Sequence, residues 1–94
     1  MKHHILVKWN ADAGDRAALA AGAEAVFRET LTIPGVHGLS VHPNVIDRPN
    51  RYDLMIVVEM DPSALPLYDR SEPHHRWKEQ FGPLIERKAI FDCD

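Results

Sequence analysis

The chain has 94 residues, the length of one domain, and a domain of this size buries only a modest hydrophobic core. Its formal net charge of -3 argues against binding a nucleic-acid backbone, because that function requires a basic surface. No apolar run approaches the roughly 18 residues that cross a membrane and no leader-like segment opens the sequence, so we expect one domain over residues 1–94, located in the cytoplasm, with no nucleic-acid or membrane partner.

The N-terminal third predicts a strand followed by a helix. Residues 3–9, HHILVKW, are apolar and β-branched, and their alternation places His3 on the same face as the three apolar side chains Ile5, Val7 and Trp9. Either Asp12 or Asp15 is suited to cap the helix that follows, and Pro34 with Gly35 ends it. The side chains that recur at helical spacing are Leu19, Ala23, Val26, Phe27 and Thr30.

Two further strands are predicted in the middle of the chain. Residues 36–45 alternate in polarity and contain Pro43, which suits an edge strand because proline removes a hydrogen-bond donor. Residues 52–60, YDLMIVVEM, form the strongest predicted strand. One of its faces carries Tyr52, Leu54, Ile56, Val58 and Met60. Met55 and Val57 make the other face apolar too, so we expect both faces to be covered, one by helices and the other by a second sheet.

The C-terminal third predicts a helix in two pieces and a last strand. Pro66 keeps the first piece short, and a second helix from about Pro73 places His74, Trp77 and Phe81 on one face. Pro83 ends or kinks that helix, and RKAIFDCD closes the chain as a strand. The only cysteine, Cys93, excludes an internal disulfide.

The resulting element order is β-α-β-β-α-β. This order indicates an α+β protein of the ferredoxin-like class, with a four-stranded antiparallel sheet and helices packed on one face. No internal repeat or low-complexity segment suggests a second domain.

Five segments resemble the stress-responsive A/B barrel (Dabb) family, in the right order and over essentially the whole chain. They are KHHILVKW, TIPGV, YDLMIVVEM, Tyr68 with the histidine pair that follows it, and AIFD near the end. The resemblance implies a ferredoxin-like monomer that forms a homodimer through its sheet, giving an α+β barrel. This agrees with a central strand that is apolar on both faces.

The resemblance also implies candidate site residues. One plant branch of the family resembles a cofactor-free polyketide cyclase, whose pocket lies between the sheet and the helices. In that branch a helical histidine is the general base, a tyrosine six residues earlier polarises a carbonyl, and another histidine lies on the first strand. These positions correspond to His74, Tyr68 and His3. No cofactor is implied. A metal site could be built from His3, His74 and a carboxylate such as Asp92, but ligands so far apart in sequence give no spacing signature, so no metal is expected.

The sequence departs from the family pattern in two places. The family usually reads His-Pro-x-His after the tyrosine, whereas this chain has Ser71, Glu72, Pro73 and His74. If the alignment gap is placed differently, His75 rather than His74 falls in the pocket. The cyclase branch also has a histidine on the third strand, near Leu54. The candidate catalytic residues are therefore His74, Tyr68 and His3, and the candidate substrate-binding residues are Trp77, Phe81, Leu54 and His75.

Three functions remain open from the sequence. The first is binding of a small, partly apolar molecule in a pocket between sheet and helices. The second is a cofactor-free cyclase, lyase or isomerase in which His74 removes a proton next to a carbonyl and Tyr68 stabilises the enolate. The third is a non-catalytic, stress-related protein whose assembly is its purpose, in which Trp77 and Phe81 would fill the pocket.

Overall fold

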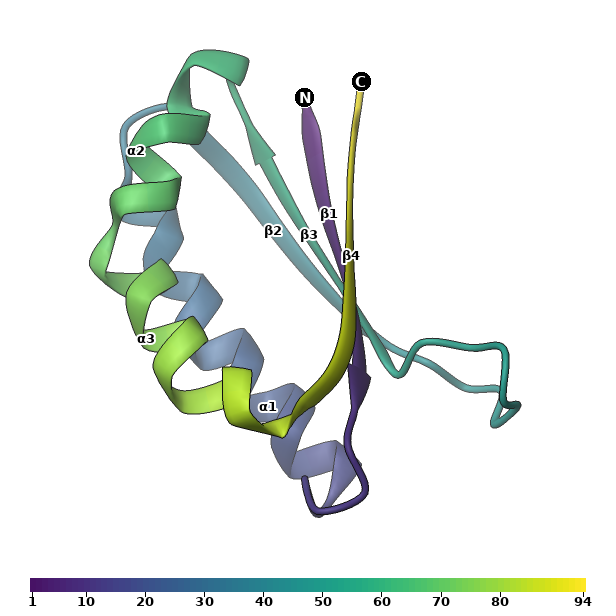
Figure 1. Cartoon of the computed structure of the whole chain (residues 1–94). Helices are drawn as coiled ribbons and strands as arrows, with labels where there is room; N and C mark the ends of the chain where they lie inside the picture. Colours follow the sequence, from purple (N-terminus) through teal and green to yellow (C-terminus); the bar gives the residue numbers. More distant parts are fainter.

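The computed structural model describes all 94 residues and contains four strands and three α-helices (Figure 1). The strands are antiparallel and lie side by side in the order β2-β3-β1-β4. This is the predicted ferredoxin-like α+β arrangement. In chain order the elements are β1 (Lys2–Trp9), α1 (Arg16–Arg28), β2 (Val36–Pro43), β3 (Leu54–Met60), α2 (Leu65–Arg70), α3 (Glu72–Phe81) and β4 (Ile85–Cys93).

The helices cover one face of the sheet, and the core lies between the two layers (Figure 1). Alternate residues of β1 and β3 point into this core, which is why His3, Ile5, Val7 and Trp9 are all buried. Trp77 from α3 lies at the centre of an aromatic cluster. Its ring centroid is 4.9 Å from that of Phe27 on α1 and 5.0 Å from that of Phe81.

No helix covers the opposite face of the sheet, which we call the open face (Figure 1). By strand alternation and pairing it carries Lys2, His4, Leu6, Lys8, Gly38, Ser40, His42, Met55, Val57, Glu59, Arg87, Ala89, Phe91 and Cys93. Its middle is apolar, as the sequence of the third strand predicted.

β2 ends at Pro43 rather than at residue 45, and two other strands begin two residues away from their predicted starts. β3 begins at Leu54 rather than Tyr52, because the residue between them, Asp53, binds elsewhere: its carboxylate accepts a hydrogen bond of 2.8 Å from the Trp9 backbone N–H. β4 begins at Ile85 rather than Arg87, because a bulge in its pairing with β1 brings Ile85 opposite Trp9. Neither difference moves the helix-covered face.

The cap of α1 is Asp15, the second of the two candidates. Its carboxylate accepts a hydrogen bond of 2.9 Å from the Ala18 N–H, whereas the Asp12 side chain makes no such bond. We expect Asp15→Ala to lower the free energy of unfolding by about 1 kcal/mol, because a helix N–H loses its acceptor. Chemical denaturation checks this, with Asp12→Ala as the matched control. An equal loss in both variants would contradict the assignment.

Candidate functional site

A hollow of about 320 Å³ lies between the sheet and the split helix. It is formed where β1 and β4 pass beneath α2 and α3. Its lining residues are His3, Ile5, Leu65, Tyr68, Asp69, His74, Trp77, Lys88, Ile90 and Asp92. The predicted residues His3, Tyr68, His74 and Trp77 therefore meet in one place.

Ser71 sets the geometry between Tyr68 and His74. Its hydroxyl donates to the Tyr68 carbonyl oxygen at 2.7 Å and accepts from the His74 backbone N–H at 3.3 Å. Ser71 is thus both the end of α2 and the N-cap of α3, which holds the two candidate side chains on either side of a fixed break. The sequence pattern had marked this position only as the place of a missing histidine.

Tyr68 is buried, with 1% of its surface exposed. Its hydroxyl has no hydrogen-bond partner among the residues of the chain. The imidazole of His3 lies edge-on to its ring at 5.2 Å between centroids, and the imidazole of His74 lies at 4.8 Å. Burial, together with the negative charges of Asp69 and Asp92, raises the pKa of Tyr68 well above its usual value near 10. The phenol therefore keeps its proton and is a donor.

His74 is half-buried at the start of α3, and its ring is fixed at one nitrogen. Nδ1 donates a hydrogen bond of 3.0 Å to the Asp69 backbone carbonyl, which can only accept. Burial is the main cause that lowers the pKa of His74, and the positive charge of Lys78 contributes. At neutral pH the imidazole is therefore uncharged and carries its free lone pair on Nε2, as a general base requires.

His3 is tied to Asp92, a carboxylate that the sequence indicated only as a third ligand of an alternative metal site. His3 and Asp92 lie opposite each other on β1 and β4, and His3 Nδ1 donates to Asp92 Oδ1 at 2.5 Å. A carboxylate bound at one ring nitrogen fixes the orientation of the imidazole. The sequence alternation groups Lys88, Ile90 and Asp92 on one face of β4, but it does not say which of them opposes His3.

Three of the predicted binding residues lie outside the lining of this hollow. Leu54 is buried in the core on β3, two strands away from β4. Phe81 lies one turn beyond Trp77 and packs toward Gly22 of α1. His75 is exposed on the outer side of α3, because adjacent helical residues point about 100° apart. The roles of the other candidates remain predictions.

The hollow is not filled by Trp77 and Phe81, the outcome that would have favoured a purely structural protein. The alternative metal site of His3, His74 and Asp92 is not assembled, and no group of three or more histidine, cysteine or carboxylate side chains lies close enough to hold a metal ion. None of the helices combines the length and the apolar character needed to cross a membrane.

Comparison with known proteins identifies the fold. No protein-family model matches the chain. No curated protein matches its sequence. A dimeric protein of unknown function with a ferredoxin-like fold from Bacteroides fragilis matches with a TM-score of 0.80 and 14% identity, over 99% of this chain and 93% of that chain.

Two other solved structures have more informative descriptions. A dabb family protein from Mesorhizobium loti matches with a TM-score of 0.73 and 14% identity, over 99% of this chain and 93% of that one. A hydroxynitrile lyase from Passiflora edulis matches with a TM-score of 0.72 and 9% identity, over 96% and 87%. The chain therefore has the ferredoxin-like α+β fold, and its resemblance to the stress-responsive A/B barrel family is confirmed at the level of that fold.

Proposed function

We propose that this protein is a homodimer in which each subunit binds a small, partly apolar molecule through an oxygen acceptor, in the hollow beneath α2 and α3. The observation that carries the proposal is the Tyr68 hydroxyl, a buried donor with no partner, at the wall of that hollow. A buried donor that is left unpaired costs about 1–3 kcal/mol, so a protein that retains one gains when a ligand supplies the acceptor.

The lining of the hollow fits such a ligand. Its volume of about 320 Å³ is at the lower end of small-molecule sites. Ile5, Trp77 and Ile90 give it an apolar wall, while Tyr68 and His74 supply polar atoms on the helix side. A ligand with an aromatic or aliphatic body and one carbonyl group matches this combination of an apolar wall and polar atoms on the helix side.

Access to the Tyr68 hydroxyl depends on His74. The hydroxyl is closed off from solvent, and the His74 ring packs at 4.8 Å from the tyrosine ring. We expect a ligand that reaches the hydroxyl to displace the half-buried His74 ring, which requires its Nδ1 hydrogen bond to the Asp69 carbonyl to break or reorient. Ligand binding is thus expected to move His74, which makes its ring protons a direct reporter.

The homodimer is supported by the open face. In a lone subunit Leu6, Met55 and Ala89 in its middle are only partly buried, and Phe91 on its edge strand is 62% exposed. The Bacteroides fragilis protein with the same fold is described as dimeric. A second copy of the chain packed sheet against sheet would cover this surface.

A second candidate function is cofactor-free proton transfer at a carbon next to a carbonyl, as in a cyclase, lyase or isomerase. The observation in its favour is the tautomer of His74, whose lone pair lies on the nitrogen that is not bound to Asp69. In this reaction Nε2 takes the proton and Tyr68 donates to the enolate oxygen. The Passiflora edulis protein, which has the same fold, is named as a lyase.

One experiment tests both candidates. The protein is titrated with 1-phenylpropan-2-one, a small aromatic ketone, in deuterated buffer and followed by NMR. Binding predicts saturable shifts of the His74 ring protons and of amides on β4 and α3. Proton transfer predicts, in addition, enzyme-dependent deuterium incorporation beside the ketone carbonyl. Shifts confined to other parts of the chain would contradict the proposed site.

We expect His74→Ala to abolish the deuterium incorporation while the protein stays folded. In the native protein the rate of deuterium incorporation should fall as the pH is lowered, because only neutral imidazole is a base. The midpoint of this fall should lie below 6.5, the ordinary pKa of histidine, because burial lowers the pKa of His74. His75→Ala, one residue along the same helix but exposed, is the matched control. Unchanged exchange in His74→Ala rules out this base.

A further inference from the structure

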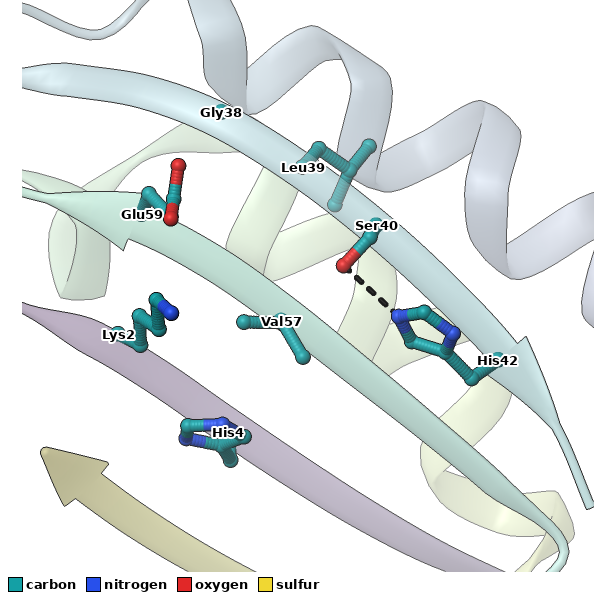
Figure 2. Close-up of a pocket in the computed structure, with 8 residues that line it drawn as sticks. All are labelled: Lys2, His4, Gly38, Leu39, Ser40, His42, Val57 and Glu59. Carbon is teal, nitrogen blue, oxygen red and sulfur yellow. Dashed lines mark hydrogen bonds between the residues drawn. The ribbon is translucent and has the colours of Figure 1, made fainter.

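The open face has a hollow of its own near the edge strand β2. Figure 2 shows this hollow from the side that lacks helices, with Gly38, Ser40 and His42 on β2 and Val57 on β3. Its volume is about 410 Å³. Ser40 has a short side chain, and Gly38 has none and is covered by the Glu59 carboxylate, so β2 itself contributes little bulk at this end of the sheet.

A large, mostly exposed side chain lies on the opposite edge strand, with an edge-on contact to the imidazole of His4 at 6.3 Å between ring centroids. Phe91 of β4 is 62% exposed and belongs to the same open face. The strand pairing places it at the level of the hollow: Phe91 lies opposite His4, His4 opposite Val57, and Val57 opposite Ser40. One edge of the open face therefore carries a projection and the other edge a recess, at the same height along the strands.

Two unpaired charges lie between these edges. Lys2 on β1 and Glu59 on β3 are opposite each other in the sheet and both line the hollow (Figure 2). Neither takes part in an ion pair within the chain; at the other end of the strands, Lys8 does pair with Asp53, at 4.0 Å. A charge that becomes buried in an interface requires a partner of opposite sign.

A single two-fold arrangement satisfies all of these features. If the axis runs parallel to the strands and between β1 and β3, then β1 lies over β3 of the partner subunit and β4 over its β2. Sheets pack about 10 Å apart, which long side chains span. Lys2 then faces Glu59 of the partner subunit, and Phe91 meets the recess at Ser40 of the partner subunit. The contact is self-complementary, as a two-fold interface must be.

Two other placements of the axis bring like charges together. With the axis across the strands at the level of Ile5, Lys2 lies over Lys8 of the partner subunit and Glu59 over Asp53 of the partner subunit. With the axis along β1, Lys2 lies over its own copy. We therefore propose that a second copy of this chain docks on the open face with Lys2 paired to Glu59 of the partner subunit and Phe91 inserted beside Ser40 of the partner subunit. This inference rests on the proposed homodimer.

Charge reversal of the two residues tests the arrangement. In Lys2→Glu the interface would contain two acidic contacts, and in Glu59→Lys two basic contacts. Each variant alone is expected to dimerise at least about tenfold more weakly than the native protein, since like charges across an interface oppose association. When the two variants are mixed, every contact becomes attractive, so a heterodimer should form. Native mass spectrometry with one variant isotope-labelled identifies the heterodimer, and sedimentation velocity measures the dissociation.

The controls separate this arrangement from the dimer itself. Lys78→Glu and Glu79→Lys, both exposed on α3, should leave the dissociation constant unchanged. A monomeric native protein would overturn the proposed homodimer. A native dimer whose Lys2→Glu and Glu59→Lys variants tighten, or remain homodimers without exchanging, would overturn this arrangement alone. Circular dichroism confirms that each variant is folded.

A steric test is independent of charge. Ser40→Trp fills the recess and is expected to weaken the dimer, because the indole occupies the space that Phe91 of the partner subunit enters. Adding Phe91→Ala to Ser40→Trp removes the clash, so the double variant should regain dimerisation relative to Ser40→Trp alone. No recovery in the double variant would place Phe91 outside the recess and contradict the proposed contact.

Discussion

Replacing Tyr68 with phenylalanine is expected to stabilise the protein and to abolish its affinity for the ketone probe. The hydroxyl is buried without a partner, so its removal relieves a desolvation penalty while the ring keeps its packing against His3 and His74. We expect a gain of about 1 kcal/mol in the free energy of unfolding, or roughly 4–8 °C in melting temperature. Thermal denaturation and the NMR titration measure the two effects on the same sample.

The opposite signs of these effects are what make the variant informative. A stability gain paired with lost binding is the signature of a group kept for function at the expense of the fold. Tyr52→Phe, on a partly exposed ring that packs with Arg87 far from the hollow, should change neither property. If Tyr68→Phe instead destabilises the protein, the hydroxyl has a structural role and the proposed donor is wrong.

The fold was accessible from sequence because its signals are local. The alternation in β1 and the prolines at 66 and 83 indicate strand faces and helix ends without any knowledge of long-range contacts. The pairing of Tyr68 with His74 was predicted from the resemblance to the stress-responsive A/B barrel family, in which a tyrosine lies six residues before the helical histidine. Ser71 could have been recognised as the cap, because serine before a Glu-Pro pair is a common start of a helix.

The rest of the site depends on contacts between distant segments. His3 and Asp92 are separated by almost the whole chain, and they meet only because β4 pairs with β1 in one particular register. Alternation assigns residues to faces, but a shift of two residues keeps the faces and changes every partner. This is why the hydrogen bond to Asp92 and the presence of Lys88 in the hollow could not be predicted.

Phe81 and Leu54, predicted as binding residues, lie outside the hollow because local sequence patterns do not show which distant segments meet. A helical period groups Phe81 with His74 and Trp77, yet it does not say how far the hollow extends along the helix. Phe81 lies beyond its end, where α3 packs against α1 at Gly22. Leu54 was placed by a family position on the third strand, and the sheet order moves that position away from the hollow beneath β1 and β4.

The two faces of the sheet separate the two proposals. Odd-numbered positions of β1 face the helices, where His3 and Ile5 line the hollow, and even-numbered positions face the surface proposed for the second subunit. His3 and His4 are neighbours in sequence but belong to different sites. A substitution on one face therefore tests one proposal, provided that the fold is intact. Trp77 is an exception, because it belongs both to the core and to the wall of the hollow.

Trp77→Ala is expected to have the largest effect on stability of any single substitution discussed. Trp77 has the largest fully buried side chain, and its ring contacts Phe27 and Phe81 at centroid distances of 4.9 and 5.0 Å. Truncating a buried tryptophan costs about 3–5 kcal/mol, a large share of the roughly 5–15 kcal/mol that stabilises a domain. Chemical denaturation should show this loss, with His75→Ala on the same helix as a control that changes little.

The same residue also forms a wall of the hollow, so binding lost in Trp77→Ala would not distinguish a missing contact from a missing fold. Trp77→Phe resolves the two, because it keeps an aromatic ring in the cluster and is expected to cost less than the alanine variant. If Trp77→Phe remains folded and binds the ketone probe with altered affinity, the indole contacts the ligand. A loss below about 1 kcal/mol for Trp77→Ala would mean that the aromatic cluster is not the centre of the core.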